Sequence, residues 1–167
     1  MGVITLSMNK TNSGFTLIEL MLTLAIAALV LSFGVPAFTD TIRNNRLSTQ
    51  ANELVAAINM TRGEAVKRGA NITLCSSNDQ TNCTATAWEN GWIIRDNNNQ
   101  VLRIHGALKG SPNIASAVTS LTYTSRGFLN GGLAVSMKLC IDSGKPGRKI
   151  NITATGRPNN LSPYPSC

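Results

Sequence analysis

The chain has 167 residues, a formal charge of +7 at pH 7, 43% hydrophobic residues and 14% charged residues. This composition excludes an intrinsically disordered chain and fits one folded domain. Aromatic residues make up 5% of the chain, which argues against a surface that binds single strands by stacking their bases.

The first feature along the chain is an apolar run of 24 residues from Phe15 to Phe38, in which Glu19 is the only charged residue. The apolar stretch of a signal peptide usually has about 7 to 15 residues, whereas a membrane-spanning helix needs about 20. The length therefore favours a membrane span. Because Lys10 precedes the run, the positive-inside rule places the polar segment 1–14 in the cytoplasm and the chain beyond Pro36 outside it.

Glu19 is a charged residue in an otherwise apolar segment, and it therefore needs a separate explanation. A carboxylate inside an apolar helix costs about 2.5 to 3.5 kcal/mol even on the mildest insertion scale, so it requires a partner. If the chain is cut between Gly14 and Phe15, the new amino group supplies a cation. In a stack of such helices, Glu19 of one subunit can then neutralise the Phe15 amine of its neighbour.

The sequence Gly14-Phe15-Thr16-Leu17-Ile18-Glu19-Leu20, with the apolar run that follows, resembles the class III signal of type IV pilins and type II secretion pseudopilins. The resemblance implies that prepilin peptidase cleaves after Gly14 and methylates the amine of Phe15. It also implies that Glu19 guides assembly with other pilins.

The same resemblance implies three segments and a location. Residues 1–14 are expected to be a cleaved leader, residues 15–38 a transmembrane and assembly helix, and residues 39–167 a periplasmic globular domain. The protein is then expected in the inner membrane as a single-pass chain, and in the pilus or at the cell surface after assembly.

Beyond Pro36 the helical period continues, with apolar residues on one face at Leu47, Ala51, Leu54, Ile58 and Ala65. One long helix is therefore predicted, with a kink at Pro36 and an end near Gly69, a residue suited to a left-handed C-cap. Arg43 and Arg46 are interpreted as solvated side chains just outside the bilayer.

After Gly69 the pattern changes to short strands separated by turns. Strands are predicted at residues 71–75, 91–95, 101–104, 121–124, 133–141 and 149–154. Residues 96–99 are expected to turn a hairpin, and Ile150, Ile152 and Ala154 are expected to face inward. A helix followed by antiparallel strands indicates an α+β fold.

Several stretches between Phe15 and Cys75 are similar to the GspH/FimT group of minor pilins and pseudopilins, and residues 139–140 and 155–157 also resemble it. These stretches are Ile42-Arg43-Asn44-Asn45-Arg46-Leu47, Gln50-Ala51-Asn52-Glu53-Leu54 and Arg62-Gly63-Glu64-Ala65-Val66-Lys67-Arg68-Gly69. The resemblance implies a long N-terminal helix packed on an antiparallel β-sandwich. It favours a minor type IV pilin, with a type II secretion pseudopilin as the alternative.

Four cysteines allow three disulfide pairings, and the export of the domain favours oxidation. Proximity along the chain suggests Cys75 with Cys83 and Cys140 with Cys167. A zinc site is the competing interpretation, but the sequence has no CxxC pair and its only histidine is His105.

No enzymatic motif is present: the sequence lacks a nucleophile elbow, a phosphate loop and an evident catalytic pair of carboxylates. We therefore expect no enzyme and no cofactor. Asp142 is interpreted as a solvated turn residue, His105 as a surface or packing residue, and Trp88 and Trp92 as core aromatics.

The remaining clue is the basic charge near the C-terminus. Residues 140–167 contain one acidic residue, Asp142, and four basic ones: Lys145, Arg148, Lys149 and Arg157. Such a cluster can attract double-stranded DNA through its phosphates, or it can be a solvated face that docks on acidic pilins. FimT-like pilins of the resembling group are associated with DNA binding through a C-terminal Gly-Arg-x-Arg motif. This chain has Gly156-Arg157-Pro158-Asn159 there, without the second arginine.

Overall fold

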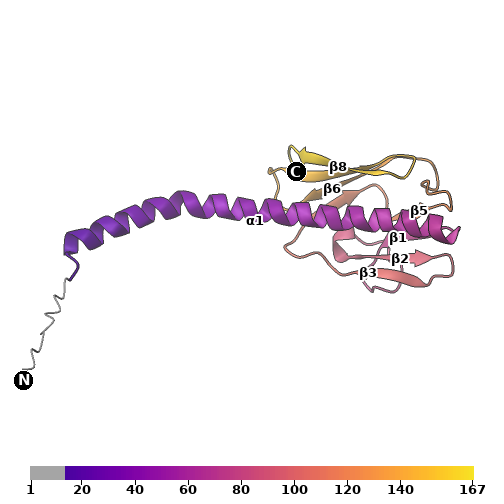
Figure 1. Cartoon of the computed structure of the whole chain (residues 1–167), viewed down its shortest axis with the longest axis horizontal. Helices are drawn as coiled ribbons and strands as arrows, with labels where there is room; N and C mark the ends of the chain where they lie inside the picture. The colour runs from indigo at the N-terminus through magenta and orange to yellow at the C-terminus, as the bar shows by residue number, and fades with distance from the viewer. Residues whose placement is uncertain (1–13) are drawn as a thin grey trace, which may run out of the picture. The chain divides into compact units, whose positions relative to one another are not determined.

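The computed structural model describes residues 14–167, so leader residues 1–13 lie outside the described part. The chain divides into two compact units, one ending at Thr41 and the other over Ile42–Cys167. A single helix, α1 (Leu17–Arg68), begins in the first unit and ends in the second (Figure 1). The prediction of one long N-terminal helix is confirmed.

The helix ends where the sequence predicts, at a glycine that adopts a left-handed conformation. Gly69 has a φ of +61°, and its N–H donates to the carbonyl of Val66 at 3.3 Å. Ala70 N–H donates to the carbonyl of Ala65, also at 3.3 Å. These two bonds form a Schellman motif, which satisfies carbonyls that the helix leaves unpaired.

The helix passes through Pro36 without a break in its assignment. Proline cannot donate a backbone hydrogen bond to the preceding turn. The hydroxyl of Thr39 donates to the carbonyl of Pro36 at 2.8 Å, and that of Thr41 donates to the carbonyl of Ala37 at 2.9 Å. The kink expected at Pro36 stays a prediction.

Two antiparallel sheets of four strands each make up the rest of the globular unit. The strands are β1 (Ile72–Ser76), β2 (Trp92–Asp96), β3 (Val101–His105), β4 (Asn113–Ser116), β5 (Ser120–Tyr123), β6 (Val135–Cys140), β7 (Gly147–Ile152) and β8 (Pro158–Tyr164), with a short 3-10 helix at Trp88–Asn90. One sheet has the order β3-β2-β1-β5 and the other β4-β6-β7-β8. The α+β fold is thus a helix packed against antiparallel sheets.

The core lies between the helix and both sheets. The predicted helix face is confirmed, because Leu47, Ala51, Leu54, Ile58 and Ala65 are all fully buried. They join one apolar cluster with inward side chains of both sheets: Ile72, Leu74, Trp92, Ile94, Leu121 and Tyr123 from the first, and Met137, Leu139, Ile150 and Ile152 from the second. Trp88 and Trp92 are core aromatics, as expected, each 2% exposed.

One tyrosine ties the two sheets together through a polar contact inside this core. Tyr123, at the end of β5, donates its hydroxyl to the carbonyl of Gly156 in the β7–β8 turn at 2.9 Å. Burial raises the pKa of the Tyr123 hydroxyl to about 12, so the group stays neutral and remains a donor at physiological pH.

The structure corrects three details of the strand prediction. Strands β4 and β8 lie in segments where none was predicted. The strand expected at 133–141 begins at Val135, and Leu133 is 76% exposed. The strand expected at 149–154 is β7, which ends at Ile152, so Ala154 is exposed in the following turn instead of facing inward.

Candidate functional site

The N-terminal candidate site comprises Gly14, Phe15 and Glu19, where α1 begins. Thr16 caps the helix: its Oγ1 accepts a hydrogen bond from Glu19 N–H at 3.3 Å, and its carbonyl accepts one from Leu20 N–H at 3.1 Å. Thr16 and Glu19 therefore have the spacing of a capping box, and a carboxylate in the first turn suits the helix dipole. This cap was not among the features predicted from the sequence, although Thr-x-x-Glu is its signal.

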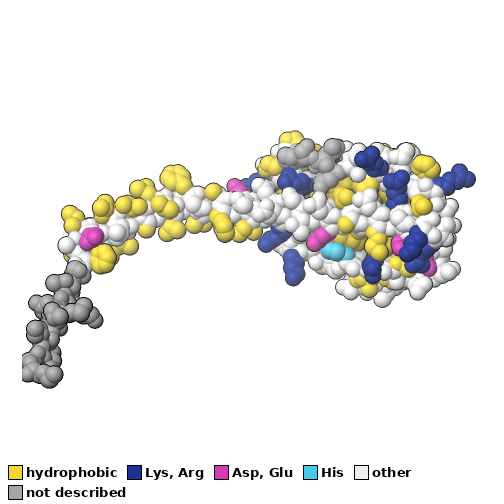
Figure 2. Space-filling model, in the orientation of Figure 1, with side chains coloured by type: hydrophobic (Ala, Val, Ile, Leu, Met, Phe, Trp, Pro, Cys, Tyr) yellow, Lys and Arg dark blue, Asp and Glu magenta, His cyan; other side chains and the backbone are white. Residues whose placement is uncertain are grey.

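The first half of α1 exposes its apolar side chains. The large ones between Phe15 and Phe38 are all more than half exposed, from 53% for Ile26 to 81% for Phe15, and they cover the N-terminal part of the helix in Figure 2. One 18-residue window of α1 reaches a mean hydropathy of 2.3. By length and composition, this part of the helix can cross a membrane.

The four basic residues predicted to bind DNA are not gathered in one place. Lys145 lies in the turn between β6 and β7, whereas Arg157 lies in the turn between β7 and β8. These turns are at opposite ends of β7, a strand of six residues, or about 20 Å at 3.3 Å per residue. Figure 2 likewise shows the Lys and Arg side chains distributed over this face of the globular unit.

Arg148 and Lys149 point to opposite faces of the sheet because they are neighbours on β7. Arg148 faces the helix, and its Nη2 donates to Ser48 Oγ at 3.0 Å. Lys149 lies directly opposite Lys138 of β6 on the outer face. The Lys138 ammonium donates to the Tyr164 hydroxyl at 3.1 Å and lies 4.8 Å from the centre of the Tyr164 ring.

All four cysteines form disulfides, in the pairings that proximity suggested. Cys75 bonds to Cys83 with a Cα–Cα distance of 5.5 Å, and Cys140 bonds to Cys167 with a Cα–Cα distance of 5.9 Å. The second bond fastens the end of the chain to β6, next to the backbone bond from Cys167 N–H to the carbonyl of Lys145 at 3.1 Å. No cysteine thiolate is left for zinc, and residues 14–167 contain no other group of three metal ligands.

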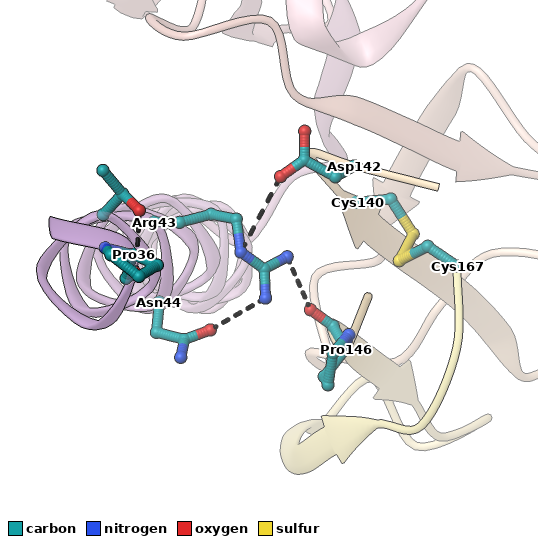
Figure 3. Close-up of polar contacts among 8 residues, drawn as sticks. Pro36, Arg43, Asn44, Cys140, Asp142, Pro146 and Cys167 are labelled. Carbon is teal, nitrogen blue, oxygen red and sulfur yellow. Dashed lines mark hydrogen bonds and ion pairs between the residues drawn. A yellow bond between two sulfur atoms is a disulfide. The ribbon is translucent and has the colours of Figure 1, made fainter. Parts of the chain in front are cut away.

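The interpretation of Arg43 as a solvated side chain is wrong. Arg43 is 9% exposed, and its guanidinium points from α1 toward the β6–β7 turn, beside the Cys140–Cys167 disulfide (Figure 3). Nη1 donates to the carbonyl of Pro146 at 3.3 Å, and Nε lies 3.8 Å from a carboxylate oxygen of Asp142. Asp142, read from the sequence as a plain turn residue, is half exposed and pairs with this arginine.

His105 is a packing residue, as expected, with a specific environment. Its ring stacks on Trp92 at a centroid distance of 3.9 Å and an interplanar angle of 8°. Its Nδ1 lies 2.8 Å from the carbonyl of Gly106, and its Nε2 lies 3.4 Å from a carboxylate oxygen of Glu53 on α1. The histidine thus links β3 to the helix.

Two family descriptions match the chain. The family described as type II transport protein GspH matches residues 50–156, and the prokaryotic N-terminal methylation motif matches residues 9–35. No curated protein matches the chain in sequence.

Similar solved structures share the fold at low sequence identity. The type IV minor pilin FimU of Pseudomonas aeruginosa PAO1 is 23% identical with a TM-score of 0.62, over 75% of this chain and 97% of that one. A second crystal form of FimU has a TM-score of 0.59 at 23% identity, over 72% of this chain and 98% of that one. The minor pseudopilin EpsH of the Vibrio cholerae type 2 secretion system is 9% identical with a TM-score of 0.51, over 70% of this chain and 97% of that one.

Proposed function

The chain belongs to the GspH family of minor pilins and pseudopilins, and we propose from this premise that it is a minor subunit of a type IV pilus. The family is structural and non-enzymatic, and the methylation motif implies processing by prepilin peptidase, assembly with other pilins and anchoring in the inner membrane before assembly. The observation that carries assembly into a filament is the N-terminal site, Gly14, Phe15 and Glu19, at the start of an exposed apolar helix. Such a helix needs lipid before assembly and neighbouring helices afterwards. Pilins and pseudopilins share this site, so the choice of a pilus is supported separately by the similarity to FimU.

We place the cleavage between Gly14 and Phe15, with methylation at the Phe15 amine. Residues 15–38 would then anchor the mature chain, and the domain from residue 39 onward would lie in the periplasm. This arrangement brings the disulfides into an oxidising compartment. The greater identity to FimU than to EpsH supports a pilus, and a pseudopilin serving protein export is the alternative.

Replacing Gly14 with Val should block cleavage, because the peptidase accepts glycine, which has no side chain, at this position. The branched side chain of valine would not fit there. Intact-mass measurement of the membrane-bound protein should show residues 1–14 still attached in Gly14→Val and absent from the parent chain. Gly14→Ala serves as the control, with a smaller effect. A parent chain that keeps the leader in a host with active peptidase would contradict the assignment.

Deleting the gene in its host separates the two assemblies. A minor pilin predicts fewer surface pili with unchanged protein export, whereas a pseudopilin predicts export substrates trapped in the periplasm with normal pili. The second result would replace the pilus proposal with the alternative.

We further propose that the globular unit binds duplex DNA weakly and without sequence preference. Lys145, Lys149 and Arg157 make the main contacts, and Arg148, which faces the helix, contributes less. The excess of basic over acidic residues in the chain and the outward Lys149 beside Lys138 support this proposal. The span of about 20 Å along β7 corresponds to about six base-pair steps of 3.4 Å. Contacts at both ends of the strand would therefore follow one stretch of phosphates.

Replacing Lys149 and Arg157 together by Gln should weaken DNA binding and its salt dependence. Each lost phosphate contact should reduce the slope of log affinity against log salt by about 0.9, so the double variant should lose about 1.8. Arg148→Gln is the matched control, because its guanidinium is already bonded to Ser48 and should contribute less. Anisotropy titrations at several salt concentrations measure the slopes, and equal slopes for parent and double variant would remove the proposal.

A further inference from the structure

A groove runs along the globular unit between α1 and the edge strand β3. It consists of two adjoining hollows, of about 190 and 410 Å³, that share Glu53 and His105 in their walls. The functions proposed for the apolar half of α1 and for the basic residues of β7 and its turns do not involve this groove.

The smaller hollow is apolar. Its floor includes Trp92, covered by the stacked ring of His105, and its walls include Ile94, Ile104 and Met60. On the helix side the small residues at positions 56 and 57, both alanine, leave the space open. The volume is that of about one large apolar side chain.

The larger hollow has more polar side chains in its walls than the smaller one, and one of them has a buried acceptor without a partner. Gln50 is 5% exposed, and its Nε2 donates to the carbonyl of Lys109 at 2.8 Å. Its Oε1 is buried in the wall of the hollow with no hydrogen-bond partner among the described residues. Buried polar atoms are almost always paired. Because this oxygen is closed to solvent, a donor from outside the chain reaches it only when the Gln50 side chain turns toward the hollow.

The charge around the groove is mainly positive. The exposed side chains of Arg46 and Lys109 border the larger hollow and that of Arg103 the smaller, whereas Glu53 is the one acid that lines either. The groove therefore favours a ligand with carboxylates.

The strand beside the groove has one unpaired edge. β3 is the terminal strand in the order β3-β2-β1-β5, so within residues 14–167 it pairs only with β2. Ile104 on this strand is 55% exposed. An apolar edge strand without a neighbour is a template for an added extended segment, which it binds through backbone hydrogen bonds.

We propose that the groove binds an extended, acidic segment of another protein, added along β3. An apolar side chain of that segment fills the hollow between Met60 and Ile104. A backbone N–H donates to Gln50 Oε1 once the Gln50 side chain has turned toward the hollow. A carboxylate of the segment lies against Arg46 and Lys109. The proposal does not depend on whether the assembly is a pilus or a secretion system.

Three labelled peptides in extended, alternating form test the proposal against the mature full-length chain in lipid nanodiscs. The first is Thr-Leu-Thr-Asp-Thr-Asp-Thr, in which Leu and both Asp side chains share one face of the extended segment. The second has Lys in place of both Asp residues, and the third has Ser in place of Leu. Anisotropy should show saturable binding of the first peptide and at least tenfold weaker binding of the other two. No saturable binding of the first peptide, or equal binding of the second, would overturn the proposal.

Substitutions on one helix locate the binding. Ala56→Trp should fill the apolar hollow and weaken the first peptide at least tenfold, whereas Asn59→Trp, on the same helix outside the groove, should leave its affinity unchanged. Gln50→Leu should weaken it several-fold because the buried acceptor is lost. Equal affinity in parent and Ala56→Trp would refute this site.

Hydrogen exchange distinguishes an added strand from a loose surface contact, because only an added strand slows the exchange of backbone amides in β3. Addition of a strand should protect backbone amides of Val101–His105 when the first peptide is bound, and the Ser peptide should not protect them at the same concentration. Binding without protection of β3 would overturn the added-strand geometry.

Discussion

Replacing Glu19 with Val is expected to remove the chain from assembled filaments while leaving it in the membrane. In the apolar helix, the unpaired carboxylate costs about 2.5 to 3.5 kcal/mol, a cost that an ionic contact with a neighbouring Phe15 amine would offset. Valine removes the cost before assembly and the attraction during it. Because 1.4 kcal/mol is a factor of ten, incorporation should fall by about two orders of magnitude.

Immunoblots of sheared filaments and of the membrane fraction measure this redistribution. Leader cleavage, followed by intact mass, should be unaffected, which separates assembly from processing. Filaments that contain normal amounts of the Glu19→Val chain would eliminate the proposed pairing.

Two matched variants separate the charge of Glu19 from its place in the helix cap. Glu19→Gln keeps the length and hydrogen-bonding capacity of the side chain but loses the charge, and it should fail in assembly nearly as Glu19→Val does. Thr16→Ala removes the Oγ1 that accepts from Glu19 N–H and should cost about 1 kcal/mol of helix stability. If Thr16→Ala abolished assembly and Glu19→Gln did not, the cap and not the ion pair would be the essential feature.

The helix was predictable because its signals are local. The spacing of Leu47, Ala51 and Leu54 depends only on the helical period, and the left-handed end at Gly69 depends on one residue that tolerates positive φ. The leader motif is also local. These features need no knowledge of what lies across the fold.

The missed features depend on contacts between distant parts of the chain. Arg43 lies beside a turn about 100 residues later, and only this turn, with Pro146 and Asp142, makes a buried guanidinium favourable. Strand β4 is short, and the prolines of β8 lower its strand propensity. Both are strands because of their partners: β4 pairs with β6, and β8 pairs with β7. The basic residues illustrate the same limit: nearness in sequence concealed their separation to both faces and both ends of β7.

The unpartnered acceptor at Gln50 was also beyond prediction. Its position on the buried side of α1 follows from the helical period, since it neighbours Ala51. That its Nε2 is paired with the carbonyl of Lys109, while its Oε1 is not paired, depends on the path of the loop after β3. Sequence predicts that a residue is buried more readily than whether its polar atoms are satisfied.

Removing the Cys140–Cys167 disulfide should produce a large loss of stability in the globular unit. The bond joins residues separated by 27 positions, and the loop-entropy relation gives about 3.5 kcal/mol for a loop of that size, within the 2 to 5 kcal/mol typical of small secreted domains. Cys140→Ala with Cys167→Ala should therefore lower the urea midpoint of a fragment over residues 42–167. The fragment contains the whole buried cluster and is expected to fold without the anchor helix.

The Cys75–Cys83 bond is the matched comparison, because it closes a loop with a separation of only 8. The same relation gives about 2.5 kcal/mol for this loop, so Cys75→Ala with Cys83→Ala should cost about 1 kcal/mol less. The difference should be larger if the first bond also holds the β6–β7 turn against Arg43, since Asp142 and Pro146 lie between its cysteine Cys140 and β7. Combining Arg43→Met with the loss of Cys140–Cys167 tests this coupling. If the two losses of unfolding free energy add, the disulfide acts only by restricting the conformations of the unfolded chain. A combined loss smaller than the sum would show that the disulfide positions the partners of Arg43.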